Sequence, residues 1–303
     1  MNFTFGPVPS RRFGMSLGIN LSPTLKQCNF DCLYCELKPA NTVDKQISTP
    51  KVSNIILEVR NTIEKYPSIN VITLTADGEP TLYPYLDQLI TQLNIIKGDI
   101  KTLILSNGGN IYDQNIQKTL TKLDIVKLSL DCISSKCFKK LDRTNKSVDC
   151  QKIADGMINF RKLYNKELII EILFVKDLND NDDEIKLLKY VLQKIKPNRI
   201  DIGTIDRPPA YDVRPITYNK LKQIANKLEN LPVCITYKNR LKAIQSFTKT
   251  NIINLLKMRP LTKEDIENTF DDLSKKRLQT LLKDDIIYST MISSVQFYKF
   301  NYG

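Results

Sequence analysis

The chain has 303 residues, of which 42% are hydrophobic and 26% are charged, as is usual for a folded globular protein. Its 45 Lys and Arg residues outnumber 33 Asp and Glu residues, and the formal net charge of +12 favours either an anionic partner such as nucleic acid or simply a solvated, Lys-rich surface. Histidine is absent, which excludes the Ser-His-Asp triad, histidine general acid–base catalysis and histidine-ligated zinc or haem.

The N-terminal stretch, MNFTFGPVPSRRFGMSLGIN, places its basic pair after a short apolar run. This arrangement is typical of neither a signal peptide nor a membrane span. We therefore expect a cytoplasmic protein with no membrane partner. Thiols stay reduced in that compartment, so clustered cysteines are expected to be metal ligands or catalytic groups rather than disulfides.

Short β-branched runs alternate with amphipathic segments along most of the chain, which predicts repeated β–α units and a parallel sheet. Strands are expected to begin near Leu17, Val71, Lys101, Ile125, Leu168 and Arg199. Helices are expected over residues 50–65, 83–96, 114–123, 150–164 and 183–195, the first with Thr49 as its N-cap and Pro50 at its first position. Residues 1–244 would then form an α/β domain of about six units, a partial (β/α)6 TIM-like barrel, because a closed barrel has eight.

Residues 245–303 show a different pattern, with three short helices followed by two β-like runs. This order is typical of a winged helix-turn-helix domain. Its third helix would present an exposed face with groups suited to a nucleic-acid groove, namely Lys275, Lys276, Arg277 and Gln279. A protein-contact module or a cap on the barrel is the alternative, since nine Lys and Arg against seven Asp and Glu make this segment only weakly basic.

Three of the seven cysteines, Cys28, Cys32 and Cys35, lie close together directly after the first predicted strand. Thiolates select zinc or iron–sulfur clusters, and a structural zinc ion normally takes four ligands. No fourth cysteine is near, which favours a [4Fe–4S] cluster with one iron open to another ligand, and structural zinc is the alternative. The spacing of Cys132, Cys137 and Cys150 matches no auxiliary cluster, so these residues are expected to be buried as small hydrophobic side chains.

The spacing C-x3-C-x2-C, with Tyr34 directly before the last cysteine, resembles the signature of the radical S-adenosylmethionine (SAM) superfamily. Three further segments resemble family motifs: ADGEP at residues 76–80, with Asp77 in place of a glycine, LSNGG at 105–109 and LSLD at 128–131. Each is expected at the carboxyl end of a successive strand, where parallel α/β folds place their active sites. The resemblance covers residues 14–205.

This resemblance implies that the three cysteines bind three irons of the cluster and that SAM chelates the fourth iron. Gly78 would let the backbone approach the cofactor, and Glu79 would pair with the SAM ammonium group. Further contacts would come from Ser106 and Asn107 to the SAM carboxylate or ribose, from Ser129 and Asp131 to the ribose, and from Tyr34 beside the adenine or the cluster. Strand-end caps and a core aromatic are the structural alternatives for these five residues.

The resemblance also implies a reaction. One electron from a reductant of the flavodoxin or ferredoxin kind passes through the cluster into SAM, and the resulting 5′-deoxyadenosyl radical abstracts hydrogen from a substrate. The protein itself is expected to position the cofactor and shield the radical, and no histidine is required.

The substrate is less well indicated. The stretches at residues 6–23 and 204–215 resemble a group of uncharacterised radical SAM iron–sulfur oxidoreductases near the wyosine tRNA synthases. Several basic residues either contact an anionic substrate or pair with carboxylates: Arg11, Arg12, Arg143, Lys146, Arg207 and Arg214. The leading hypothesis is a radical SAM enzyme that modifies RNA, in particular tRNA. The alternatives are a peptide- or protein-modifying or glycyl-radical-activating enzyme, and a non-enzymatic iron–sulfur or zinc DNA-binding regulator.

Overall fold

The computed structural model describes residues 3–10, 12–145, 148–236, 244–258, 260–292 and 295–301. An eight-stranded sheet in sequential order forms its centre. Its first two strands pair antiparallel, and the following neighbours pair parallel. The strands are β1 (Thr4–Ser10), β2 (Gly14–Asn20), β3 (Val71–Thr75), β4 (Lys101–Ser106), β5 (Ile125–Ser129), β6 (Glu167–Phe174), β7 (Arg199–Thr204) and β8 (Val233–Ile235).

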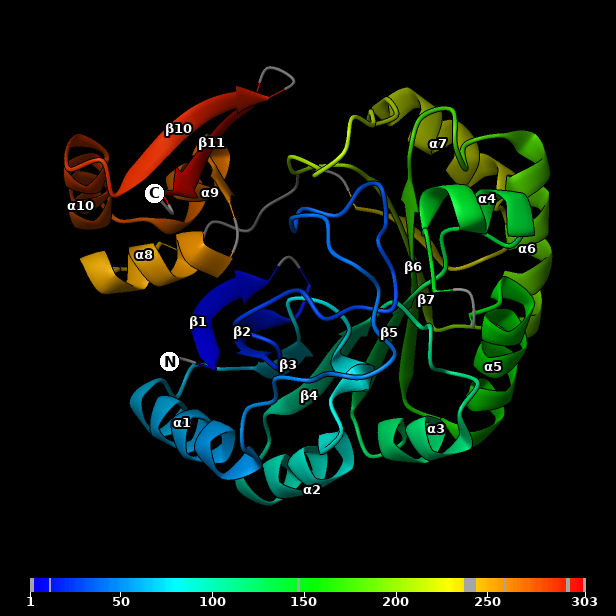
Figure 1. The fold of residues 1–303 in the computed structure, drawn as a ribbon, viewed down its shortest axis with the longest axis horizontal. Coiled ribbons are helices and arrows are strands. Elements are labelled where there is room, and N and C mark those ends of the chain that lie inside the picture. Colours follow the sequence, from blue (N-terminus) through cyan, green and yellow to red (C-terminus); the bar gives the residue numbers. More distant parts are fainter. Residues whose placement is uncertain are drawn as a thin grey trace.

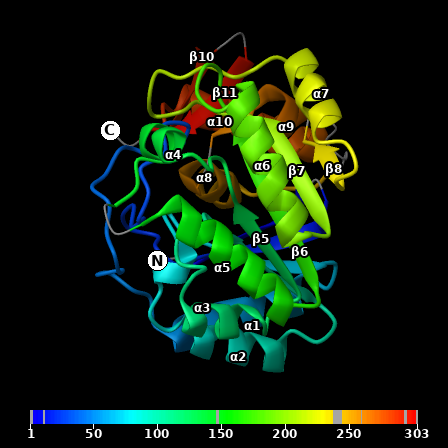
Figure 2. The same ribbon diagram turned by 90° about the vertical axis from the view of Figure 1, so that its right-hand side faces the viewer.

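The connecting helices cover the outer side of the curved sheet, and α5 and α6 lie in front of its central strands in the turned view (Figures 1 and 2). Each helix turns an apolar stripe toward the sheet; α6, for example, buries Ile185, Leu188 and Leu192. The helices are α1 (Val52–Lys65), α2 (Leu86–Ile96), α3 (Gln114–Leu120), α4 (Ser135–Leu141), α5 (Cys150–Leu163), α6 (Asp182–Ile195) and α7 (Tyr218–Lys227), with a 3-10 turn, η1, at Pro80–Leu82.

The predicted α/β class with a mostly parallel sheet is confirmed, and the six predicted strands are present. Each of these six strands, β2 to β7, is followed by a helix, as the prediction of about six β–α units requires, and two further strands, β1 and β8, extend the sheet at its edges. The prediction for the start of α1 was also wrong. Its N-cap is Lys51, without a side-chain hydrogen bond, and the helix begins at Val52 rather than Pro50.

The three helices and the hairpin expected in the C-terminal segment are present. They are α8 (Lys249–Met258), α9 (Lys263–Thr269), α10 (Asp272–Lys283), β10 (Ile287–Ile292) and β11 (Val295–Phe300), and a short strand, β9 (Leu261–Thr262), joins the hairpin in the order β10-β11-β9. This segment has its own apolar core around Phe247, Leu256 and Phe270. It lies beside β1, and Val8 of that strand packs against its core (Figure 1).

The predicted exposed face of α10 is only partly correct. Lys276 and Gln279 are exposed, whereas Lys275 and Arg277 are half-buried. Lys275 forms an ion pair with Glu267, with its Nζ 2.7 Å from the carboxylate, and Arg277 donates to the carbonyl oxygen of Phe247 at 2.7 Å. Two of the four candidate groove contacts are therefore already used inside the protein.

The amino end of the sheet's inner face is closed by apolar side chains. Val71, Leu103, Ile125 and Ile169, from four adjacent strands, form a buried cluster, and Phe13 from the β1–β2 turn packs against it. The functional site is therefore expected at the carboxyl ends of the strands. None of the helices in the described part of the chain has both the length and the apolar character that crossing a membrane requires.

Candidate functional site

The loop that carries Cys28, Cys32 and Cys35 follows β2 and is attached to the sheet through Gln27. The backbone of Gln27 donates to the carbonyl of Asp77 at 2.9 Å and accepts from the amide of Glu79 at 3.0 Å. Its fully buried side chain donates hydrogen bonds to the hydroxyl of Ser22 and to the carbonyl of Ser48. These two hydrogen bonds hold the beginning and the end of the loop together. The sequence offered no signal for this role, because a single glutamine before a cysteine is ordinary.

The middle of the loop is held by α4. The amide of Leu33 donates to the carbonyl of Leu141 at 2.9 Å, and the amide of Asp31 donates to the carbonyl of Asp142 at 3.1 Å. The Cys32 sulfur lies 3.7 Å from the carboxylate of Asp142. A helix that the sequence did not predict therefore fixes the position of the second cysteine.

Asp31 adds a charged anchor to this loop. Its carboxylate binds Lys26 at 2.8 Å and Arg143 at 3.4 Å and accepts a short hydrogen bond from Tyr211. The Arg143 guanidinium also lies 4.6 Å from the centre of the Tyr211 ring. Arg143, a candidate substrate contact, is thus placed beside the cysteine loop in an ion pair.

The three motif cysteines are free and half-buried. Burial raises the pKa of Cys28 to about 12 and also raises the pKa of Cys32 and Cys35, so a bound metal would have to displace their protons. Within the described residues, the three sulfur atoms are not gathered within 4.8 Å of one another. The sulfur ligands of a single zinc ion would lie within about 4.6 Å, twice the Zn–S distance. A loop with three free thiols at wider separation suits a cluster better.

Gly78 and Glu79 lie at the carboxyl end of β3, where they meet the cysteine loop. Gly78 has a φ of +138°, and a Cβ at this position would lie 2.0 Å from the carbonyl oxygen of Gln27. Glu79 is 1% exposed. Its Oε1 accepts hydrogen bonds from the Thr81 hydroxyl and amide and from Ser106, at 2.6 to 2.9 Å, and its Oε2 accepts from the Asn107 amide at 2.7 Å.

The Glu79 carboxylate therefore binds two other candidate residues, Ser106 and Asn107, into one network. Burial raises its pKa, while these hydrogen bonds oppose the shift. A carboxylate offers about four acceptor positions, and Oε2 uses one of its two. A ligand ammonium group could occupy the second.

The remaining candidates gather around the carboxyl end of β5. The Tyr34 hydroxyl donates a short hydrogen bond to Asp131, which is buried and also accepts from the Leu173 amide at 2.6 Å. Burial raises the pKa of Asp131 to about 7. Tyr34, Asn107, Ser129 and Asp131 line one small cavity. Asn107 reaches back to the loop, with its amide nitrogen 3.5 Å from the Cys28 sulfur.

A much larger cavity of about 650 Å³ lies between the inner face of the sheet and the C-terminal segment. Tyr34, Cys35 and Asp77 line it on the side of the cysteine loop. Two of the predicted substrate contacts reach it, each paired with an acid: Arg12 with Asp201, and Arg207 with Glu36 at 2.8 Å. Arg214 is exposed and does not line the cavity. Arg11 and Lys146 lie outside the described residues.

Asp77, which lines this cavity, is expected to make the free energy of unfolding depend on pH. Burial raises its pKa to about 6, although a hydrogen bond with Asn20 opposes the shift. Asp77→Asn is expected to raise the free energy of unfolding by up to about 3 kcal/mol at pH 7 and to have no such effect below about pH 4. A folded-state pKa above the unfolded value means that the wild type loses this stability as the pH rises through about 6. Urea unfolding between pH 4 and pH 8 measures the effect, with the exposed Asp99→Asn as control; a gain independent of pH would contradict it.

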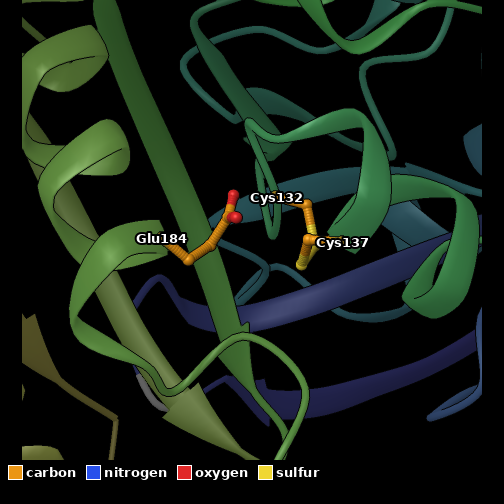
Figure 3. A group of neighbouring side chains, drawn as sticks. All are labelled: Cys132, Cys137 and Glu184. Atoms are coloured by element: carbon orange, nitrogen blue, oxygen red, sulfur yellow. A yellow bond between two sulfur atoms is a disulfide. The ribbon is translucent and has the colours of Figure 1, made fainter.

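A second pair of cysteines, Cys132 and Cys137, lies at the start of α4 (Figure 3), and Cys132 also lines the small cavity. Cys132 and Cys137 are buried and joined by a disulfide, so the expectation of reduced thiols is not met at this pair. Glu184 of α6 lies beside them and accepts hydrogen bonds from the backbone of Ile133 and from Ser134. Cys150 is free and buried, as predicted. The disulfide leaves no thiol pair here for an auxiliary cluster.

Comparison with known proteins agrees with this geometry. Residues 22–188 match the sequence model of the Radical SAM superfamily. The chain belongs to this superfamily. It is 38% identical to a "UPF0026 protein" of Helicobacter pylori strain J99 over 97% of this chain and 96% of that one, and 33% identical to a "UPF0026 protein" of Methanocaldococcus jannaschii over 69% and 65%. The crystal structure of Streptococcus suis SuiB bound to S-adenosylmethionine has the same fold, with a TM-score of 0.57 and 17% identity over 73% of this chain and 51% of that one.

Because members of the Radical SAM superfamily are enzymes that use a [4Fe–4S] cluster and SAM, the chain is an enzyme with these cofactors. Two alternatives from the sequence are thereby wrong: a non-enzymatic DNA-binding regulator and a structural zinc site. Enzymes of this superfamily also need an external reductant, as predicted.

Proposed function

We propose that the protein cleaves SAM reductively and uses the product to abstract hydrogen from a substrate held in the 650 Å³ cavity. The observation that carries this proposal is the position of the cysteine loop. Cys35 and Tyr34 line the cavity, so a cluster bound by the loop would face the enclosed space in which a radical is shielded from water. When bound, the cluster supplies the electron that splits SAM into methionine and a 5′-deoxyadenosyl radical.

The chain's own residues bind and orient the cofactors in this proposal. Cys28, Cys32 and Cys35 hold the cluster. Glu79 offers the open acceptor position of Oε2 to the SAM ammonium group, while Gly78 leaves room for the backbone approach. Ser106 and Asn107 are assigned to the SAM carboxylate or ribose, Ser129 and Asp131 to the ribose hydroxyls, and Tyr34 to the adenine or the cluster.

The test is anaerobic reconstitution with iron and sulfide, followed by dithionite and SAM and chromatography for 5′-deoxyadenosine. Formation of this product is expected only when SAM, cluster and reductant are all present. Omission of the reductant is the control. Reconstituted protein that binds four irons yet releases no 5′-deoxyadenosine would contradict the proposal.

RNA modification is the first candidate for the wider activity. The net charge of +12 favours it, and so does the order of elements in residues 245–303, which we assign to a winged-helix domain distinct from the radical SAM domain of residues 1–244. Binding of labelled tRNA that weakens steeply with salt, together with stimulated 5′-deoxyadenosine formation, would support this candidate. No binding above background at low salt would remove it.

A protein substrate is the second candidate. A Methanocaldococcus jannaschii relative that is 28% identical over 57% of this chain is named a putative glycyl-radical enzyme activating enzyme. Under this candidate, residues 245–303 are a peptide-docking module. The test adds a protein fraction from cell extract to the SAM-cleavage assay. Stimulation of SAM cleavage that survives nuclease treatment of this fraction but is lost after its proteolysis would favour a protein substrate over RNA.

A further inference from the structure

Helix α4 has a buried side and a basic side. The residues that pack into the protein are Cys137, Phe138 and Leu141. The exposed basic residues are Lys136, Lys139 and Lys140. These three lysines occupy positions i, i+3 and i+4, which are neighbours on one side of a helix. We call them the lysine face of α4.

The acids that neighbour α4 along the chain do not neutralise the lysine face. Asp131 and Asp142 are buried, and Asp149 accepts hydrogen bonds from two backbone amides at the start of α5. The acidic first turn of α6 lies at the other, amino end of α4, where Glu184 accepts a hydrogen bond from Ser134. Positive charge therefore remains toward the carboxyl end of α4, and an acidic partner complements it.

The carboxyl end of α4 is attached directly to the cysteine loop, and Figure 2 shows the helix beside this loop. The carbonyl of Leu141, next to Lys140, accepts a hydrogen bond from the amide of Leu33, next to Cys32. The path from Lys140 to Cys32 therefore consists of covalent bonds and one hydrogen bond. Electron transfer between proteins becomes much slower with distance, so a donor has to dock where a cluster ligand lies near the surface. The lysine face meets this requirement.

The cysteine loop has two sides with different surroundings. Tyr34 and Cys35 line the large cavity, and none of the described residues of α4 does so. Cys32 is on the side of α4, with its sulfur 3.7 Å from the Asp142 carboxylate. A partner bound to the lysine face thus leaves the cavity open to the substrate. This face suits a partner that delivers an electron without entering the cavity.

We propose that the lysine face of α4 is the docking site for an acidic one-electron carrier protein of the flavodoxin or ferredoxin kind. The reduced carrier loses one electron, the bound cluster gains it through the Cys32 side of the loop, and no proton or chemical group is transferred. The lysines attract and orient the carrier through complementary charge. The inference rests on the proposed function, because the cluster that accepts the electron is the one that cleaves SAM.

The test uses an acidic flavodoxin, reduced to its hydroquinone and mixed anaerobically with the reconstituted full-length protein. Stopped-flow absorbance follows flavodoxin oxidation at about 0.01 M salt, where charges act over roughly 30 Å, and at about 1 M salt, where they are screened within roughly 3 Å. Lys139→Glu combined with Lys140→Glu is expected to lower the second-order rate constant at least about tenfold at low salt, because electrostatic steering raises association rates by roughly 10- to 1,000-fold. At high salt the wild type and this α4 variant are expected to react equally fast.

Two controls separate docking from folding and from SAM chemistry. Arg60→Glu combined with Lys65→Glu makes the same charge change at exposed sites of α1, which is well separated from α4 in both views (Figures 1 and 2), and is expected to keep the wild-type rate constant. Dithionite is a small reductant that needs no docking site. With dithionite, the α4 variant is expected to bind the wild-type amount of iron and to form 5′-deoxyadenosine like the wild type.

A wild-type rate constant that does not depend on salt, an α4 variant that oxidises flavodoxin as fast as the wild type at low salt, or an equal loss in the α1 variant would each overturn the inference. An α4 variant that loses tRNA binding but keeps the rate of electron transfer would also overturn it and would assign the lysine face to RNA. If flavodoxin is oxidised as expected but no 5′-deoxyadenosine forms, only the proposed function fails. If dithionite yields 5′-deoxyadenosine but the α4 lysines do not affect flavodoxin oxidation, only this inference fails.

Discussion

Cys32→Ala protein is expected to lose both the cluster and the formation of 5′-deoxyadenosine. Cys32 is the middle ligand of the proposed cluster and is held in place by the α4 contacts of its neighbours Asp31 and Leu33. Loss of residues that only support a metal ligand commonly costs 10- to 100-fold in metal affinity or activity. Loss of the ligand itself is therefore expected to exceed about 100-fold in product formation, measured together with bound iron and sulfide after reconstitution.

Cys234→Ala is the matched control, because Cys234 is an exposed free cysteine on the edge strand β8. It should bind iron and sulfide at the wild-type ratio. The assignment of the ligands would be wrong if Cys32→Ala bound the same amount of iron as Cys234→Ala and retained product formation.

The second large effect is expected at Gly78. A Cβ there would meet the Gln27 carbonyl oxygen at 2.0 Å and its carbon at 2.4 Å, and the φ of +138° is a conformation that L residues rarely adopt. Gly78→Ala must push Gln27, and with it Cys28, away from β3. We expect a loss of more than about 3 kcal/mol in the free energy of unfolding, from backbone strain together with the broken backbone bridge, and loss of SAM-dependent product.

Gly98→Ala is the control that separates the strain of a positive φ from the clash with Gln27. Gly98 also has a positive φ, of +54°, but a Cβ there meets nothing within 4 Å. It is expected to cost only about 1 kcal/mol, the penalty of a left-handed backbone conformation. Urea unfolding compares the two variants, and equal losses would show that the contact with Gln27 has no role.

Local sequence patterns predicted the central strands well, because the apolar pattern that indicates each strand lies within a few consecutive residues. The β-branched runs of β3 to β7 are buried by helices on one face, and the polar groups that follow them sit at the strand ends. β1 was missed because Pro7 and Pro9 lie within it, and proline is tolerated only on an edge strand such as this one. β8 has three residues, too few for a periodic signal.

The anchors of the cysteine loop could not be predicted, because they depend on contacts between distant segments. Gln27 meets Asp77 and Glu79 some fifty residues away, and Asp31 meets Tyr211 from the far end of the sheet. The disulfide was missed for another reason, since the expected cellular compartment argued against it. The ion pairs of Lys127 with Glu171 and Asp201 did leave a signal, because these charged residues interrupt apolar strands, but only the pairing of β5, β6 and β7 in one sheet brings them together.

The attachment of the cysteine loop through Gln27 also bears on how the holoenzyme is assembled. The loop has almost no regular secondary structure, yet the backbone bridge to β3, the contacts with α4 and the Gln27 side chain already restrict it. Most of the conformational entropy of ordering the loop is thus lost when the polypeptide folds and not when iron arrives. Whereas a zinc finger folds only with its metal, this apoprotein should mature by inserting a cofactor into a finished scaffold.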